Sequence, residues 1–456
     1  MRRPYPRGSI VQPESSGDAP HPLWTGVTPA NKKIGQGSNR RVSSTAGLGA
    51  DEQDSRYSWL RLSAALVLGT VGTVGMWSYV VTLPVVQAEY ALARADATVP
   101  YTLAMIGFGS GSMLMGWLSD RFGVLVPVVC GAILLGIGYT AATYSNLLLL
   151  SLAYGLIGLG SSAAFVPLMA DISQWFTRRR GVAVVTASCG NYLSGALWSP
   201  LIERSIAANG WRGTHLAIGV ICVIVMLPLA LLALRRRVPH QIGMVASPTA
   251  PAKGTLGLSP NALTALLSIA AIGCCVAMAT PQVQIVAYCG DLGYGAARGA
   301  EMLSVMLALG VVSRVAAGWL ADRIGGLTAL LLGSLLQAGA LLLFVAFDGL
   351  AALYLVSGLF GLFQGGIVPM YAIVVREYFP VEEAGIRAGT IIGISVVGMA
   401  LGGWASGVLI DLTGFYTWAF AHGFLWNLLN AAIVLWLLMR SGWGPARRLV
   451  PRFQSS

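Results

Sequence analysis

The chain has 456 residues, of which 55% are hydrophobic and only 10% are charged, and its mean hydropathy is +0.70. Soluble proteins carry about 25% charged residues, so this composition excludes an ordinary soluble protein and indicates a polytopic membrane protein. The formal net charge is +11, but the basic residues gather in tails and loops beside apolar segments, which argues against nucleic acid as a partner.

Residues 1–57 are rich in Ser, Gly, Pro and Arg and lack apolar periodicity, which predicts a disordered cytoplasmic tail. No apolar stretch follows Arg2 and Arg3, so the segment does not resemble a secretory signal. A transit peptide and an over-long gene reading are alternatives. Acidic residues argue against the transit peptide: Glu14, Asp18, Asp51, Glu52 and Asp54.

Twelve apolar segments follow, and most are long enough to cross about 30 Å of hydrocarbon. Their expected bounds are 62–84, 100–119, 124–144, 147–172, 181–203, 214–234, 262–288, 299–320, 326–347, 350–375, 388–409 and 417–439. The sequence therefore predicts an all-α membrane protein with two six-helix bundles. The expected domains after the tail are a bundle at 58–234, a cytoplasmic linker at 235–261, a bundle at 262–440 and a cytoplasmic tail at 441–456.

The basic residues predict the orientation of these spans. With the N-terminus in the cytoplasm, 24 of the 29 Lys and Arg lie on the cytoplasmic side, four lie outside, and one, Arg314, lies within a span. This distribution follows the positive-inside rule. We expect a multi-pass protein of the plasma (cell inner) membrane with both termini in the cytoplasm and with basic residues that meet anionic lipid.

One eight-residue pattern occurs twice, 202 positions apart (322 minus 120), as GWLSDRFG at 116–123 and GWLADRIG at 318–325. Each copy ends the second span of its half. The first glycine would let backbones approach, the aspartate would accept hydrogen bonds from a helix N-terminus, and the last glycine would permit a tight turn. The arginine would pair with acids or lipid phosphate. The expected gating residues are Gly116, Asp120, Arg121, Gly123, Gly318, Asp322, Arg323 and Gly325.

The repeated pattern resembles the loop 2–3 signature of the major facilitator superfamily, G-x-x-x-D-R-x-G followed by basic residues, and the resemblance covers about residues 58–440. It departs at its end, where Val124 and Gly326 replace the usual Lys or Arg. The resemblance implies two six-helix bundles around a central cavity near the midplane. It also implies that the loop gates between inward-open and outward-open states and performs no chemistry.

Shorter segments resemble one branch, the monocarboxylate porters and oxalate/formate antiporters: 180–183, 199–203, 210–212, 288–293 and 407–416. The chain also departs from that branch. It has no charge at 388–407, where the antiporters carry a second basic residue, and no lysine late in the first span. Gly310 stands where proton-linked porters have an acid one turn before the arginine. One cationic site suggests a monocarboxylate, and the route of a coupling proton stays open.

Arg314 is the residue on which the functional prediction depends. It precedes Asp322 by eight residues, which is about 12 Å along a helix and places it near mid-membrane. An arginine there costs at least about 2.5–3.5 kcal/mol, and no acid in the spans is an obvious partner. We expect a substrate carboxylate to be the partner, because a guanidinium offers it two parallel donors. The resemblance implies the same role. The alternative is an arginine satisfied by backbone carbonyls or water.

Polar and aromatic side chains on four other spans complete the expected substrate site. The predicted substrate-binding residues are Arg314, Asn191, Tyr192, Gln282, Gln284, Gln364, Tyr79 and Tyr371. For each residue other than Arg314, helix packing or interfacial anchoring is the alternative role. Three prolines are expected to break or kink their helices: Pro167, Pro281 and Pro369.

The sequence predicts no enzyme, since it lacks a phosphate-binding G-x-x-x-x-G-K-[ST] loop, a serine–histidine–acid set and a metal-ligand cluster; no cofactor is expected. The predicted function is secondary active transport of a small organic anion, in particular a monocarboxylate, by alternating access. A coupling proton is an open further partner. The alternatives are a drug or amphiphile exporter of the same fold and a non-transporting membrane sensor.

Overall fold

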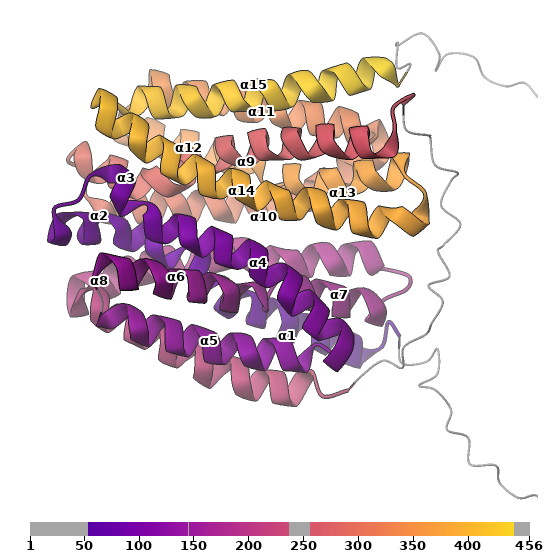
Figure 1. The fold of residues 1–456 in the computed structure, drawn as a ribbon, viewed down its shortest axis with the longest axis horizontal. Helices are drawn as coiled ribbons and strands as arrows, with labels where there is room; N and C mark the ends of the chain where they lie inside the picture. Colours follow the sequence, from indigo (N-terminus) through magenta and orange to yellow (C-terminus); the bar gives the residue numbers. More distant parts are fainter. Residues whose placement is uncertain (1–52, 145, 237–255, 442–456) are drawn as a thin grey trace, which may run out of the picture. The chain divides into compact units, whose positions relative to one another are not determined.

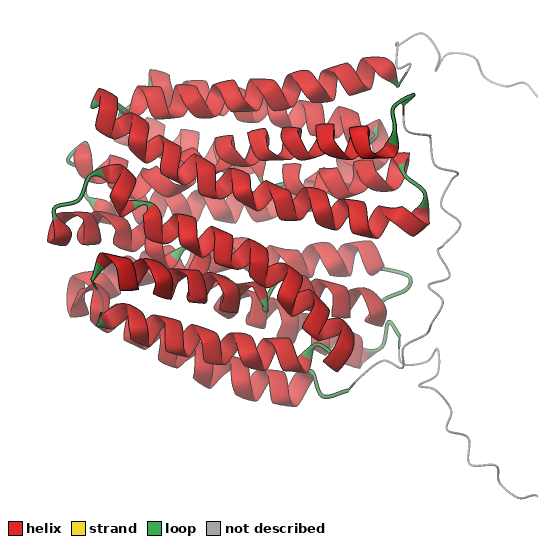
Figure 2. Ribbon diagram, viewed as in Figure 1, coloured by secondary structure: helices red, strands yellow, loops and turns green. Residues whose placement is uncertain are grey.

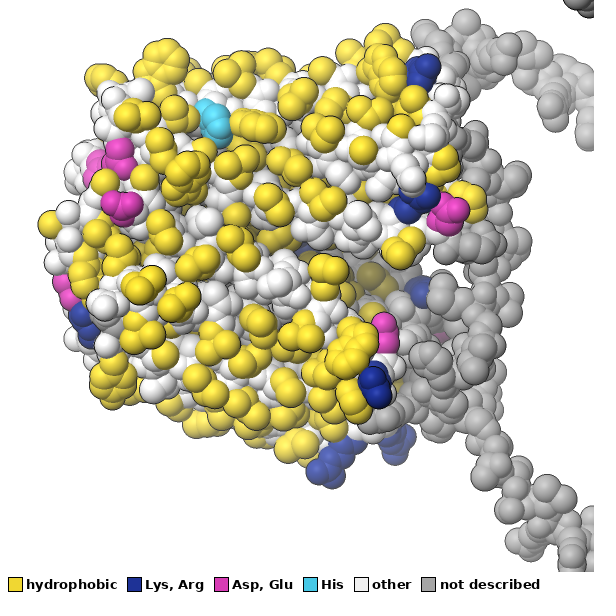
Figure 3. Space-filling model, in the orientation of Figure 1, with side chains coloured by type: hydrophobic (Ala, Val, Ile, Leu, Met, Phe, Trp, Pro, Cys, Tyr) yellow, Lys and Arg dark blue, Asp and Glu magenta, His cyan; other side chains and the backbone are white. Residues whose placement is uncertain are grey.

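The computed structural model describes residues 53–144, 146–236 and 256–441. Most of the expected tails and linker lie outside the described residues. The described part is built from helices, with no strand in it (Figure 2). In the space-filling view, hydrophobic side chains cover the middle of the visible face while charged side chains gather toward two ends (Figure 3). That distribution suits a body whose middle lies in hydrocarbon.

The helices of the described residues form two halves that follow each other along the chain (Figure 1). The N-terminal half contains α1 (Arg56–Gly72), η2 (Thr73–Met76), α2 (Ser78–Tyr90), α3 (Arg94–Ala97), α4 (Val99–Phe122), α5 (Leu125–Thr143), α6 (Leu147–Ser162), α7 (Val166–Trp175) and α8 (Arg180–Ala233). The C-terminal half contains α9 (Pro260–Asp291), α10 (Ala296–Ile324), α11 (Gly326–Ala346), α12 (Leu350–Gln364), α13 (Ile367–Tyr378), α14 (Val381–Thr413) and α15 (Tyr416–Arg440).

Ten helical segments of the described chain are long and apolar enough to cross a membrane, judged by length and composition. One of them, α8, holds two crossings, because Gly210 has φ 70° and ψ 164° and interrupts the helix. The remaining crossing is α4, whose central glycines and serines make it less apolar. The predicted twelve-helix, all-α membrane fold is confirmed. The helices outrun the expected spans because helical structure continues into polar residues at both ends.

Three crossings are interrupted, which the expected continuous spans did not include. The 3₁₀ turn η2 divides the first crossing, residues 163–165 separate α6 from α7, and residues 365–366 separate α12 from α13. Pro167 and Pro369 follow directly after these two last breaks, in the first turn of a new helix where a missing N–H costs little. Pro281 was expected to break or kink its helix; it does not break it, since α9 continues through it, as membrane helices often do at proline.

The two halves meet along two seams, α8 against α10 and α4 against α14. Inside each half, one glycine allows equivalent helices to touch. A Cβ on Gly158 of α6 would lie 1.9 Å from the carbonyl oxygen of Ala104 on α4. A Cβ on Gly361 of α12 would lie 1.9 Å from the carbonyl oxygen of Met306 on α10. The halves therefore repeat the same close backbone approach, which is typical of membrane helix packing.

Candidate functional site

The breaks of α6/α7 and α12/α13 occupy equivalent places in the two halves. Adding the 202-residue offset of the repeated motif to residues 163–165 gives 365–367, which overlaps the second break. Helices interrupted at corresponding positions of two repeats expose backbone groups near the midplane, and in transporters they mark the binding site. The second break lies directly beside the arginine that the sequence singled out.

Arg314 lies on α10 with only 6% of its surface exposed. Its Nη1 donates to the carbonyl oxygen of Ser188 on α8 at 2.7 Å, and its Nε donates to the carbonyl oxygen of Gly365 in the break at 3.2 Å. Among the described residues no carboxylate pairs with it. Hydrogen bonds of charged groups contribute about 1.5–3 kcal/mol each, so these carbonyls offset the cost of placing the charge there. Backbone carbonyls were the alternative partners that the sequence left open for Arg314, and they are its partners in the structure.

An aromatic wall covers the same guanidinium. The Cζ of Arg314 lies 4.0 Å from the ring centroid of Tyr192, a cation–π contact. The ring of Trp77 meets Tyr192 edge-on at 6.4 Å, and Trp77 Nε1 donates to the backbone and side-chain oxygens of Asn191 at 2.9 and 3.1 Å. Arg314, Tyr192 and Asn191 are thus brought together, with Trp77 fixing the asparagine.

Gln282 on α9 and Gln364 on α12 form a buried amide pair. Gln282 Nε2 donates to Gln364 Oε1 at 3.1 Å. Gln282 Oε1 and Gln364 Nε2 are buried and make no hydrogen bond with any described residue. Gln364 directly precedes Gly365, the residue that binds Arg314. The pair therefore leaves one acceptor and one donor unused close to the break.

Three predicted site residues have partners elsewhere. The hydroxyl of Tyr79 donates to the carbonyl oxygen of Ala97 at 2.6 Å, inside the N-terminal half. The hydroxyl of Tyr371 donates to Asn430 Oδ1 at 2.8 Å, inside the C-terminal half. Gln284 Nε2 donates to the hydroxyl of Ser406 at 3.0 Å. These contacts fit helix packing, so the candidate site narrows to Arg314, Tyr192, Asn191, Gln282 and Gln364.

Both seams are closed at one end of the molecule and open at the other. We call the end that carries the two repeated loops the motif end, and the end that carries α3 the latch end. Along α8 and α10, Ser304 donates to Ala196 O, a Cβ on Gly310 would lie 2.5 Å from the Tyr192 ring, and Arg314 bonds Ser188. One turn further on, Gly318 has no neighbour within 4 Å of a Cβ.

The second seam shows the same change along its length. A Cβ on Gly407 would lie 3.0 Å from Arg94 O, one on Gly403 2.7 Å from the Tyr101 ring, and one on Gly109 3.5 Å from Val396. Toward the motif end the seam opens, and a Cβ would meet nothing within 4 Å at Gly116, Gly389 or Gly393. In Figure 3 the surface is hollowed between the halves at that end. Arg314 thus stands where the closed part of its seam ends.

The repeated loops match each other in detail. Gly123 has φ 81° and ψ 162°, and Gly325 has φ 85° and ψ 154°, so both glycines have a positive φ that side chains rarely adopt, in the tight turn expected there. The arginines stack on tryptophans four residues earlier, at 5.7 Å for Arg121 over Trp117 and 3.6 Å for Arg323 over Trp319. Asp120 and Asp322 are exposed, and neither makes a hydrogen bond or ion pair within the described chain.

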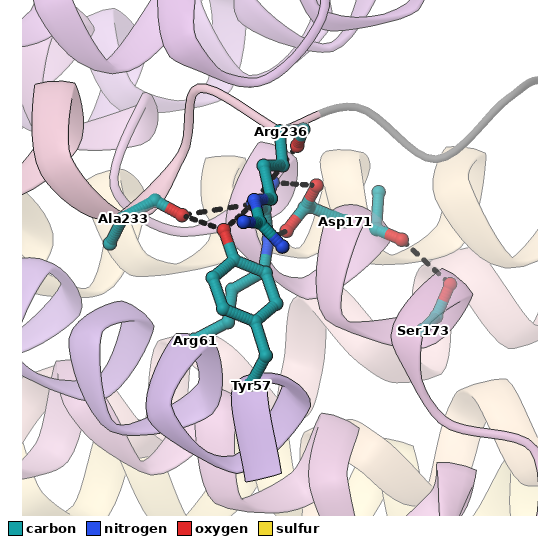
Figure 4. Close-up of polar contacts among 7 residues, drawn as sticks. Tyr57, Arg61, Asp171, Ser173, Ala233 and Arg236 are labelled. Atoms are coloured by element: carbon teal, nitrogen blue, oxygen red, sulfur yellow. Dashed lines mark hydrogen bonds and ion pairs between the residues drawn. The ribbon is translucent and has the colours of Figure 1, made fainter. Parts of the chain in front are cut away.

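Sequence reasoning missed a buried ion pair at the motif end of the N-terminal half (Figure 4). Arg61 of α1 donates twice to the carboxylate of Asp171 on α7, at 2.7 and 2.8 Å. Its Nη1 also donates to Ala233 O at 2.9 Å and Arg236 O at 3.1 Å. The network joins the ends of α1, α7 and α8. The only signal for this pair in the sequence was the position of Arg61, a charged residue directly before the expected span at 62–84.

A second contact lies just before α1. The carboxylate of Asp54 accepts from the backbone N–H of Arg178 at 3.0 Å and from the hydroxyl and N–H of Thr177. The Arg178 N–H is the largest influence that holds the pKa of this carboxyl below its usual range. This contact ties the segment before α1 to the loop that leads into α8.

No group of three potential metal-ligating side chains occurs among the described residues.

Comparison with known proteins fits this geometry. The sequence matches the Major Facilitator Superfamily over residues 65–352 and 290–450. The chain belongs to the major facilitator superfamily. It is 28% identical over 406 residues to monocarboxylate transporter 13 of Bos taurus, covering 85% of this chain and 91% of that one. It is 27% identical over 413 residues to human monocarboxylate transporter 11, covering 85% and 82% of the two chains.

Solved structures of the superfamily share the fold at low sequence identity. The crystal structure of a bacterial homologue of the human lysosomal transporter Spinster, in an inward-facing and occupied conformation, has a TM-score of 0.63 at 14% identity. The match covers 85% of this chain and 96% of that one. The described fold is therefore that of a major facilitator transporter, a multi-pass membrane protein that moves a small-molecule substrate.

Proposed function

We propose that the protein is a secondary active transporter of a small organic monocarboxylate and that Arg314 binds the carboxylate. The observation that carries the proposal is a buried guanidinium without a protein carboxylate among the described residues. Its carbonyl partners come from opposite halves, Ser188 from one and Gly365 from the other. Movement of the halves would break one of these bonds, and a bidentate carboxylate would replace it with stronger, charge-assisted bonds.

The surroundings support an anion with a small polar body. Tyr192 and Trp77 supply aromatic surface, and the Gln282–Gln364 pair supplies one free acceptor and one free donor. A ligand site of this kind binds its apolar part by contact and fixes its orientation with a few polar groups. The amide pair favours a monocarboxylate that carries an additional uncharged polar group. The names of the relatives, monocarboxylate transporters 13 and 11, agree with the class.

The seams support alternating access. Contacts between the halves persist from the latch end to Arg314 and cease toward the motif end. With the basic motif end in the cytoplasm, as the positive-inside rule requires, the described state is open to the cytoplasm and closed to the outside. The repeated loops would meet their opposite half in the other state. Both termini would then lie in the cytoplasm, at the inner membrane of the cell.

Uptake into proteoliposomes tests the proposal. Purified full-length chain is reconstituted, and accumulation of labelled carboxylates is measured with and without a pH gradient. We expect saturable uptake of a monocarboxylate that other simple carboxylates inhibit, and loss of that uptake in Arg314→Gln. Stimulation by an inward proton gradient would identify the coupling ion.

Two outcomes would contradict the proposal. Transport of cationic amphiphiles that survives Arg314→Gln would show a drug exporter instead. Carboxylate binding in the absence of accumulation under every imposed gradient would show a membrane sensor. A monocarboxylate taken up equally well by native protein and Arg314→Gln would leave a transporter but remove the arginine from its binding site.

A further inference from the structure

The latch end contains a contact between the halves that the binding site does not use. The short helix α3, in the connection between the first two crossings, enters the C-terminal half against the ends of α9, α14 and α15. Its first residue, Arg94, is only 5% exposed. Arg94 Nη2 donates to Asp291 Oδ2 at 2.6 Å and to the hydroxyl of Tyr416 at 3.0 Å. The Tyr416 hydroxyl donates to the same carboxylate oxygen at 2.5 Å.

A second carboxylate holds the backbone of the same helix. Asp411 Oδ1 accepts from the N–H of Arg94 and Asp411 Oδ2 from the N–H of Ala95, both at 2.7 Å. An acid at the start of a helix satisfies donors that have no partner inside the helix. One turn earlier on α14, a Cβ on Gly407 would lie 3.0 Å from Arg94 O and 3.1 Å from the Cα of Ala95. A side chain at position 407 would therefore be tight against α3 and would push the two helices slightly apart.

Apart from the Tyr416–Asp291 bond, which lies inside the C-terminal half, each of these contacts joins opposite halves. Arg94 and Ala95 belong to the N-terminal half, while Asp291, Gly407, Asp411 and Tyr416 belong to the C-terminal half. Asp291 and Asp411 lie in segments 288–293 and 407–416, which resemble one branch of transporters. The structure brings their acidic residues to the same short helix.

We infer that Arg94, Asp291 and Asp411 form an outer gate, which is closed in the described state and must break before the latch end can open. The position supports this role, because α3 lies at the end of the molecule where both seams keep their contacts, and both seams lose contact toward the motif end. Two halves that pivot about a central site exchange contacts at one end for contacts at the other. Residues that join the halves at the closed end therefore set the balance between the two states.

The chemistry of the gate allows it to open. Asp291 keeps 54% of its side chain exposed, so water can replace Arg94 as its partner. Arg94 Nε and Nη1 make no hydrogen bond with described residues although they are buried, so the arginine is incompletely satisfied while the gate is closed. A gate of this kind favours one state without locking it. It also gives two substitutions that keep side-chain size, remove the negative charge and leave one acceptor oxygen instead of two, Asp291→Asn and Asp411→Asn.

The inference is tested by distances measured without any solute. Spin labels are attached to introduced cysteines in full-length protein in nanodiscs, with Cys130, the one native cysteine of six that is not buried, changed to serine. Leu148→Cys with Leu412→Cys reports the latch end, and Met113→Cys with Ile386→Cys reports the opposite end; all four positions are exposed. The gate variants are Arg94→Ala and Asp411→Asn.

We expect each gate variant to raise the fraction of molecules with a longer latch-end distance and a shorter motif-end distance by about tenfold, since charge-assisted contacts are lost from one of two states. Exchanging the charges, with Arg94→Asp and Asp291→Arg together, should return part of the native distribution. The control is Arg298→Ala, an exposed arginine that pairs with Glu301 on its own helix and not across the halves.

The inference is overturned if both gate variants keep the native distances, or if Arg298→Ala shifts them equally. Should Arg94→Ala fail to fold, Asp411→Asn decides by the same two distances, since it keeps side-chain size. No solute takes part in the measurement. The distance measurements can therefore contradict the proposed gate while the uptake measurements support carboxylate transport, and the reverse is equally possible.

Discussion

Arg314 donates to the carbonyl oxygen of Ser188 at 2.7 Å, a hydrogen bond that joins residues 126 positions apart in opposite halves of the chain. One turn further along α10, a Cβ on Gly318 would meet no atom within 4 Å. The bond to Ser188 depends on how the two halves lie relative to each other. The other bond of Arg314, to Gly365, stays within the C-terminal half. If Arg314 binds the carboxylate as proposed, the same residue would respond both to the position of the halves and to the presence of the substrate.

Arg314→Lys should weaken carboxylate binding strongly. A lysine keeps the charge but cannot donate two parallel bonds to a carboxylate, and a lost charge-assisted bond of about 1.5–3 kcal/mol corresponds to about a tenfold or larger rise in KM. Initial rates of proteoliposome uptake measure it, with Arg298→Lys as the control. If Arg314 is only structural, the variant will instead lower the unfolding temperature and leave the KM of the remaining protein unchanged.

The ring of Tyr192 should matter more than its hydroxyl. Tyr192→Phe keeps the face that lies 4.0 Å from the guanidinium, whereas Tyr192→Leu removes a buried cation–π contact worth about 2 kcal/mol. We expect near-native carboxylate affinity for the first and a loss of about tenfold or more for the second. Gly310→Ala should resemble Tyr192→Leu, because its Cβ would lie 2.5 Å from the ring and displace it. Equal affinities for the two Tyr192 variants would exclude the ring from the site.

The sequence could predict those parts of the site that are visible along the chain, but not those that depend on how side chains are arranged in space. A lone arginine in an apolar run and a motif repeated at a fixed offset are visible along the chain, so Arg314 and the turns at Gly123 and Gly325 were found. The direction of a side chain around its helix is not visible there. Tyr371 was assigned to the cavity, yet its partner is Asn430, 59 positions later and inside the same half.

Arg61 shows the converse limitation. Along the chain it is only a basic residue that stands one position before an expected span. The helix begins earlier, at Arg56, and the chain returns twice to the same end, which buries the guanidinium against Asp171 and Ala233. Only the packing of three crossings reveals that pair. Likewise, the break at 163–165 contains no proline, and Pro167 lies just after it rather than within it.

The glycines at the closest helix contacts should not tolerate a methyl group. Gly158→Ala and Gly361→Ala would each place a carbon 1.9 Å from a carbonyl oxygen, and overpacking of this kind costs about 1–3 kcal/mol or more. Thermal unfolding in detergent should show a lower midpoint for both. Gly116→Ala and Gly318→Ala are matched controls with no neighbour within 4 Å, and they should keep or raise the midpoint. Equal midpoints in all four variants would contradict the packing.

The first glycine of each repeated loop should be needed for movement rather than for the described state. Gly116→Leu and Gly318→Leu place a side chain where no atom lies within 4 Å of the Cβ, so the fold should accept them. If the motif end closes during transport, the leucine will fill the approaching surface and uptake will fall severalfold at an unchanged unfolding temperature. Met113→Leu, on an exposed position of α4, is the control. Native uptake in both variants would mean that this end does not close at those glycines.

The Arg61–Asp171 pair should stabilise the fold and contribute nothing to substrate affinity. Breaking a buried ion pair by removing one charge costs about 3–5 kcal/mol, while removing both charges costs much less. Asp171→Asn and Arg61→Met should therefore each lower the unfolding midpoint by several degrees, and Arg61→Met with Asp171→Leu should recover part of it. KM for carboxylate should stay native in all three, because the network lies at the motif end, away from Arg314. A changed KM at an unchanged unfolding midpoint would reverse this assignment and make the pair part of the transport cycle.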